Sequence, residues 1–222
     1  MIEPIDALEA ETTRLGDFLA ALGPGDWSLP TRCPPMNVRE LAVHALRGAY
    51  RIIDALSAPA LEGEPEKDAI TYWRYDAATV GKEVVARAKA ESDARAADAD
   101  IASEWREAWT KALAMARAGA DDDVLIPAVP GTIRLREFLK TRCIEVTIHG
   151  MDLGHALGRG PDPTPGGLEA TCDVLRGILG VDLRPLGMDD VRFALAGTGR
   201  AELSDSDREM LGPLTESFPL LQ

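Results

Sequence analysis

The stretch Thr141-Arg-Cys-Ile-Glu-Val-Thr-Ile-His-Gly-Met-Asp-Leu153 decides the fold, because it places ionisable side chains inside an apolar pattern. At about 100° per residue, its polar side chains fall within roughly 80° of one another around a helix; they are Arg142, Glu145, His149 and Asp152. The same arc should face a core, because it also holds Leu135, Phe138, Leu153 and Ala156. Burying the polar groups unpaired would cost several kcal/mol each, so they must satisfy one another or hold a ligand.

Apolar spacing and turn residues outline the rest of the chain. They predict helices at 4–22, 37–56, 70–119 (one or two helices, interrupted near 92–100), 135–157 and 168–179. Segment 124–135 is typical of a loop or short ribbon, 191–195 alternates like a strand, and Ser204 is a good N-cap. We therefore expect a mainly α fold, with a four-helix bundle over residues 1–160 and a small C-terminal α/β extension over residues 161–222.

Composition narrows the class of protein. Hydrophobic residues make up 45% of the chain and charged residues 27%, as in ordinary globular domains. The formal net charge of -13 repels phosphate backbones and anionic membranes, so we expect neither nucleic acid nor a membrane as a partner. Cys33, Cys143 and Cys172 are odd in number and widely spaced, which argues against a disulfide framework. The start of the chain has no signal-peptide pattern, and we expect a cytoplasmic protein.

Glu145 and His149 form a candidate pair of metal ligands. At positions i and i+4 of a helix, their carboxylate and imidazole can point at one atom. His44 lies near the apolar stripe of the helix predicted at 37–56 and is a candidate third ligand. Two histidines and one carboxylate leave coordination positions open, as catalytic zinc and some iron or nickel sites require. Spacing alone also allows a hydrogen-bonded core histidine and a structural ion pair between Arg142 and Asp152.

Two segments carry a resemblance to a known family. The first is Trp27-x2-Pro30-Thr31-x-Cys33-Pro34 followed by Asn37-Val38-Arg39-Glu40-Leu41-x2-His44, and the second is Glu145-x3-His149-Gly150-x-Asp152-Leu153. In order and separation they resemble the mycothiol-dependent maleylpyruvate isomerase family, within the DinB-like superfamily of metal-binding four-helix bundles. The resemblance implies that His44, Glu145 and His149 bind a divalent metal, zinc first, with nickel or iron as alternatives.

The resemblance also implies a chemistry. A low-molecular-weight thiol such as mycothiol would serve as cofactor or co-substrate, and its thiolate would add to a small electrophilic substrate. Return of the thiol gives isomerisation, and retention gives S-transfer. We assign Arg142 to neutralising a carboxylate and Asp152 to orienting a ligand imidazole. In the isomerase, a larger second domain contributes an arginine to the active site. Arg200 is the candidate for this arginine here, with Arg192 as a second candidate. DinB-like bundles are often dimers, so a homodimer is expected.

The chain departs from the family pattern in one loop. Pro35 and Met36 stand where the family usually has glycine and tryptophan, and this loop is expected beside the metal. Two other functions therefore stay open: a metal-binding or protein-interaction module without turnover, and a metal-dependent hydrolase with Asp152 as the base. Cys33 is interpreted as a packed loop cysteine. His155, roughly 240° around the helix from His149, is expected to face away from the site.

Overall fold

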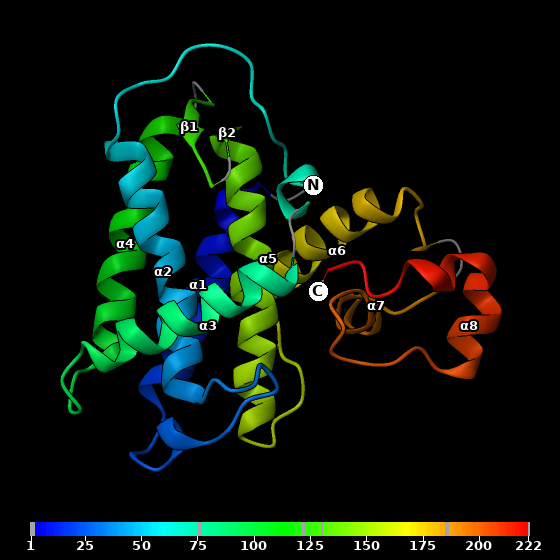
Figure 1. The fold of residues 1–222 in the computed structure, drawn as a ribbon, viewed down its shortest axis with the longest axis horizontal. Coiled ribbons are helices and arrows are strands. Elements are labelled where there is room, and N and C mark those ends of the chain that lie inside the picture. Colours follow the sequence, from blue (N-terminus) through cyan, green and yellow to red (C-terminus); the bar gives the residue numbers. More distant parts are fainter. Residues whose placement is uncertain (1–2, 75–76, 121–122, 130, 185–186, 222) are drawn as a thin grey trace.

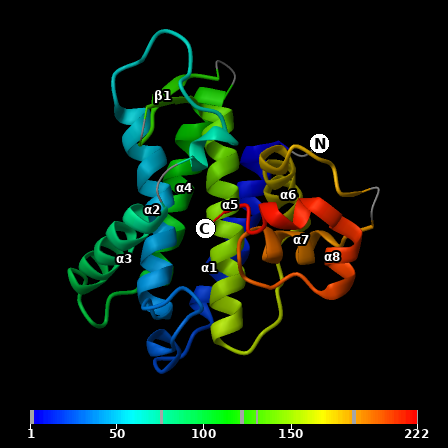
Figure 2. The same ribbon diagram turned by 45° about the vertical axis from the view of Figure 1, so that its right-hand side comes forward.

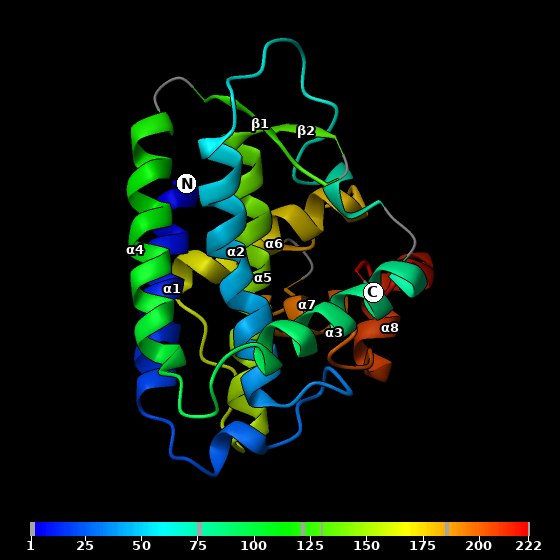
Figure 3. The same ribbon diagram turned by 60° about the vertical axis from the view of Figure 1, so that its left-hand side comes forward.

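Four long helices form a bundle in the part of the chain that the structure, a computed structural model, describes: residues 3–74, 77–120, 123–129, 131–184 and 187–221 (Figure 1). The bundle helices are α1 (Pro4–Ala20), α2 (Val38–Ser57), α4 (Ile101–Ala120) and α5 (Leu135–Ala156). Both α1 and α2 contact α4 and α5. A further helix, α3 (Ala77–Asp93), packs on α2 and crosses it obliquely (Figure 3).

The bundle encloses an apolar core. Its largest fully buried side chains include Leu8, Leu15, Leu41, Leu46, Ile52 and Trp105. The indole nitrogen of Trp105 donates a hydrogen bond to the carbonyl oxygen of Thr12 at 2.8 Å, so this buried donor is satisfied. A Cβ atom at Gly16 would lie 3.1 Å from the same indole, which explains why α1 carries a glycine there. The core therefore fixes how the helices are placed around the site.

The residues just before α2 and α5 determine where these two bundle helices begin. α2 begins at a capping box, in which Asn37 accepts from the backbone of Glu40 at 2.9 Å and Glu40 accepts from the backbone of Asn37 at 3.0 Å. α5 follows directly on an antiparallel hairpin of β1 (Leu125–Pro127) and β2 (Thr132–Arg134). The predicted cap and the predicted short ribbon are both confirmed.

The C-terminal extension is helical and lies beside the bundle (Figure 2). It comprises α6 (Pro165–Leu179), α7 (Asp190–Gly197), α8 (Asp205–Leu211) and the 3-10 turn η4 (Gly212–Ser217). Two further 3-10 turns, η1 (Asp26–Ser28) and η2 (Thr71–Trp73), lie before α2 and before α3. α6 contacts α1 and α5, and α7 packs on α6. A second apolar cluster, which includes Phe193 and Leu175, joins the extension to Ile148 and Met151 of α5.

The mainly α fold is confirmed, and one predicted element is wrong. The segment predicted as a strand, 191–195, is part of helix α7. Asp189 caps this helix by accepting from the backbone of Arg192 at 2.9 Å, and the buried residues Phe193, Ala194, Ala196 and Gly197 have helical spacing. An alternation over five residues was too short to outweigh that cap. The interruption near 92–100 is confirmed between α3 and α4, and the division at residue 160 stays a prediction.

Among the described residues, none of the helices combines the length and the apolar character that a membrane span needs.

Candidate metal centre

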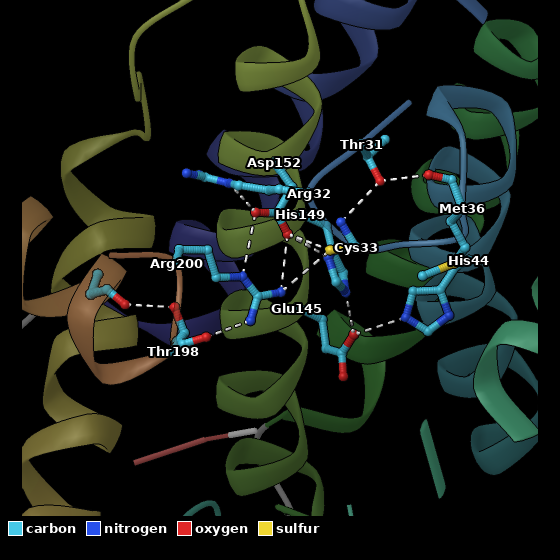
Figure 4. A network of polar contacts seen from close by, with 11 residues as sticks. Thr31, Arg32, Cys33, Met36, His44, Glu145, His149, Asp152, Thr198 and Arg200 are labelled. Atoms are coloured by element: carbon cyan, nitrogen blue, oxygen red, sulfur yellow. Dashed lines mark hydrogen bonds and ion pairs between the residues drawn. The ribbon is translucent and has the colours of Figure 1, made fainter. Parts of the chain in front are cut away.

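Helices α2 and α5 bring the three predicted ligands together (Figure 4). Oε2 of Glu145 lies 3.5 Å from Nε2 of His44 and 3.4 Å from Nε2 of His149. The two imidazole rings meet edge to face, with centroids 5.0 Å apart. All three donor atoms lie within 4.8 Å of one another. His44, 101 positions before Glu145 in the chain, thus joins a pair that one turn of α5 already aligns.

The geometry of the three donors fits a divalent cation. In a tetrahedral zinc site with bonds of about 2.0–2.1 Å, neighbouring donor atoms lie about 3.3 Å apart. The two separations from Glu145, 3.5 and 3.4 Å, are close to this value. Two imidazole nitrogens and one carboxylate oxygen are also a donor set of catalytic zinc sites, which keep a further coordination position open. His44, Glu145 and His149 could therefore hold such an ion.

Burial and mutual contacts set the charges in the centre. Burial raises the pKa of Glu145, but hydrogen bonds with His149 and His44 and the charge of Arg142 outweigh it and hold the pKa well below its usual range. Burial lowers the pKa of His44. Burial also lowers the pKa of His149, yet its contacts with Asp152, Cys33 and Glu145 prevail and raise that pKa well above its usual value. The centre thus contains an ionised carboxylate, and a bound cation would replace a proton on His149.

Asp152 holds the imidazole of His149 from the side away from Glu145. Its Oδ2 lies 3.1 Å from Nδ1 of His149 and accepts from Nη2 of Arg200 at 3.0 Å. Its Oδ1 accepts from Nε of Arg32 at 2.8 Å, and the thiol of Cys33 donates to Oδ2 at 3.1 Å. Burial raises the pKa of the wholly buried Asp152, but His149 and Arg200 outweigh it and lower the pKa. A carboxylate on Nδ1 leaves Nε2 to face the ligand position.

Arg142 approaches the other oxygen of Glu145. Its Nη2 lies 4.0 Å from Oε1 of Glu145 and donates to the hydroxyl oxygen of Tyr72 at 3.1 Å. The guanidinium also stacks over the ring of Phe138, 4.9 Å from its centroid. The Arg142 side chain is only 4% exposed, so little water screens the attraction between its charge and Glu145. Arg142 and Asp152 therefore do not pair with each other, as one structural alternative had required.

Other predicted residues have clear positions. Arg200 follows α7, donates to the backbone carbonyl of Thr198 at 2.7 Å, and reaches Asp152. Arg192 lies elsewhere, because it pairs with Asp207 at 2.6 Å. His155 is exposed, as predicted from its position around the helix.

A pocket of about 360 Å³ opens onto the three donors. Cys33 and Arg200 add polar groups to its lining. Its walls are mainly apolar, formed by Met36, Trp73, Val80, Val84, Val85, Ile144, Ile148 and Leu221. Such a pocket suits a small molecule with a polar end directed at the donors and an apolar or uncharged body.

The sequence interpretation missed several residues beside the centre. Cys33 packs against the core of the bundle, as predicted, but it also lines the pocket and donates to Asp152, which the sequence interpretation did not include. Arg32 and Tyr72 were not considered, although they hold Asp152 and Arg142. A usable signal existed for Arg32 and Cys33, because both lie within the loop signature that precedes His44. Tyr72 carried no such signal, since its partner lies 70 positions away in the chain.

Comparison with known proteins identifies the family. The family model described as "Mycothiol maleylpyruvate isomerase N-terminal domain" matches residues 8–154, which include all three donors. No curated protein and no solved structure matches the chain. Because the match spans more than half of the chain and most of the bundle, the protein belongs to the mycothiol maleylpyruvate isomerase N-terminal domain family, within the DinB-like superfamily.

Proposed function

We propose that the protein is a divalent-metal-dependent enzyme that uses a low-molecular-weight thiol, mycothiol or a close relative, for isomerisation or S-transfer on a small electrophile. The observation that carries this proposal is the convergence of His44, Glu145 and His149 on one point of the 360 Å³ pocket. The family supplies the link to a mycothiol-type thiol. Zinc is the preferred ion because two imidazoles and one carboxylate match its catalytic sites.

Each residue of the centre has a distinct role in this proposal. When bound, the cation supplies a positive charge that lowers the pKa of a thiol and keeps it as the nucleophilic thiolate. Asp152 keeps Nδ1 of His149 occupied, so that Nε2 stays directed at the ligand position. The apolar walls limit water around the thiol. Arg200 stands at the pocket and offers a guanidinium to an anionic group of either reactant.

The thiol chemistry balances without an external oxidant or reductant. The thiolate forms a bond to an electrophilic carbon of a conjugated substrate, the carbon–carbon double bond at that carbon becomes a single bond, and its electron pair moves onto the conjugated carbonyl oxygen. Rotation about this bond, followed by cleavage of the carbon–sulfur bond, returns the thiolate and gives the isomer. Protonation of the adduct instead leaves the sulfur on the product and completes S-transfer.

Metal content and thiol binding of matched variants test the proposal. We expect His149→Ala and Glu145→Gln to lose the copurified metal, measured by elemental analysis, and to lose binding of mycothiol, measured by calorimetric titration. His155→Ala is the matched control, because this histidine lies on the same helix but is exposed. Full thiol turnover by metal-free His149→Ala would overturn the proposal. Metal without any thiol binding would identify a metal-binding module instead.

A further inference from the structure

A second pocket adjoins the first at His44 and Glu145 and is rich in arginine. It has a volume of about 160 Å³ and shares these two residues, together with Trp73, Val80 and Val84, with the larger pocket. Its arginines come from three helices: Arg47 and Arg51 from α2, Arg87 from α3 and Arg142 from α5. In a chain with a net charge of -13, such a local concentration of positive charge needs a specific reason.

Two of these guanidinium groups converge on one oxygen atom. Arg51 donates from Nη1 to the hydroxyl oxygen of Tyr72 at 3.3 Å, and Arg142 donates to the same oxygen at 3.1 Å. Among the described residues, Arg51 has no carboxylate within ion-pair distance, and Arg142 has only Glu145 at 4.0 Å. Oε2 of Glu145 already faces two histidines, so little negative charge is left to compensate the charges of Arg51 and Arg142.

Further donors around this pocket lack partners. The Nε atoms of Arg47 and Arg87 and the indole nitrogen of Trp73 are buried without a hydrogen-bond partner in the described part of the chain. Arg47 is partly neutralised by Glu91, whereas the charges of Arg142 and Arg87 add to burial in lowering the pKa of Arg51. Glu83 also lines the pocket, but it is exposed. Buried donors and mutually repelling cations are the surroundings that an anion stabilises.

We propose that the pocket formed by Arg51, Arg87, Arg142 and Tyr72 is a subsite for a carboxylate group of the small substrate. The inference rests on the proposed function, since it places the electrophile with its carboxylate here and its remaining atoms toward His44 and Glu145. A planar carboxylate can accept parallel hydrogen bonds from guanidinium forks, which lysine could not supply in the same geometry. A volume of about 160 Å³ admits this group and a short carbon chain.

Calorimetric titration with succinate, with succinamide as the uncharged match, tests the subsite on the full chain as purified. We expect succinate to bind and succinamide not to bind. Arg51→Gln and Arg87→Gln should each weaken succinate binding by about tenfold or more, because each removes a charged donor. Arg51→Lys should recover part of that loss. Arg106→Gln, on the exposed surface of α4, is the control and should bind like the unmodified protein.

The outcomes distinguish this subsite from the metal proposal. Equal binding of succinamide, or unchanged succinate affinity in both glutamine variants with unchanged thermal unfolding, would overturn the subsite. Tighter binding of inorganic phosphate than of succinate would overturn the choice of a carboxylate. If the protein holds metal and mycothiol but no succinate, only the subsite fails. If succinate binding depends on Arg51 while no metal or thiol binds, the subsite stands and the proposed function fails.

Discussion

The bundle and the C-terminal extension contribute to the site in different ways. The bundle supplies His44, Glu145 and His149 on two helices that are positioned by a large apolar core. The extension supplies Arg200, whose guanidinium reaches Asp152 across the boundary between the two regions. Apolar packing in the bundle thus positions the three candidate metal ligands, whereas an ion pair with Asp152 positions the guanidinium of Arg200 beside the pocket.

Ion pairs also stabilise the extension itself, and three of them share one arginine. Arg176, with a side chain only 8% exposed, contacts Asp173 at 3.1 Å, Asp182 at 3.6 Å and also Asp190. Arg192 joins α7 to α8 through Asp207. Its apolar cluster is smaller than the core of the bundle. The loss of free energy of unfolding caused by a substitution should therefore differ between the two regions, both in magnitude and in its dependence on pH.

The largest effect is expected for Trp105→Ala in the bundle. The side chain is fully buried, so its removal leaves a cavity and loses the indole hydrogen bond to the carbonyl oxygen of Thr12. We expect the free energy of unfolding to fall by about 4 kcal/mol, measured by urea denaturation. Trp27→Ala, at a half-buried position of η1, should cost clearly less. A loss below about 1 kcal/mol at Trp105 would contradict the role given to the core.

Asp152→Asn should have the next largest effect, because it weakens the link between the two regions. The substitution keeps the shape but removes the charge that Arg32, Arg200 and His149 face. We expect a loss of about 2–3 kcal/mol in urea denaturation. A double-mutant cycle with Arg200→Gln should give a coupling free energy above about 1 kcal/mol. Asp17→Asn, in an exposed pair, should cost less than about 0.5 kcal/mol.

Asn37→Ala tests the capping box that starts α2. The side chain satisfies the backbone amide of Glu40 and helps fix the helix that carries His44. We expect a loss of about 1 kcal/mol in thermal or urea unfolding, and Asn37→Gly should lose only a few tenths. Equal losses for the two variants would show that the cap geometry does not matter here.

Asp207→Asn tests the matching capping box of α8 and should have the smallest effect, roughly 0.5 kcal/mol at neutral pH. Burial raises the pKa of Asp207, but Ser204 and Arg192 outweigh it and lower the pKa from 3.8 to about 2. Because the folded pKa lies below its usual value, the stabilisation is complete above about pH 4 and is lost as the pH falls through about 2. The difference between Asp207→Asn and the unmodified protein should therefore shrink from pH 5 to pH 2.5. A constant difference would contradict the assignment.

The sequence predicted the fold better than the surroundings of the site. Helical spacing was enough to place Glu145 and His149 on one face, because both lie on the same turn of α5. His44 needed the resemblance, since nothing local ties α2 to α5. The cluster of Arg51, Arg87 and Tyr72 could not be predicted, because it forms only when α2, η2 and α3 pack together. The alternation over 191–195 does not indicate helix α7, because it assigns Ala194 to the exposed face of a strand, whereas Ala194 is buried in the structure.

The contacts of Asp152 have a consequence for how the chain is made. This buried carboxylate is paired with Arg32 from the early part of the chain and with Arg200 from its late part. During synthesis the bundle through α5 leaves the ribosome before Arg200 does, and early segments generally fold first. The nascent bundle therefore holds Asp152 with only one of its two arginines. Docking of the segment after α7 then adds the second arginine to Asp152 and brings Arg200 to the lining of the pocket.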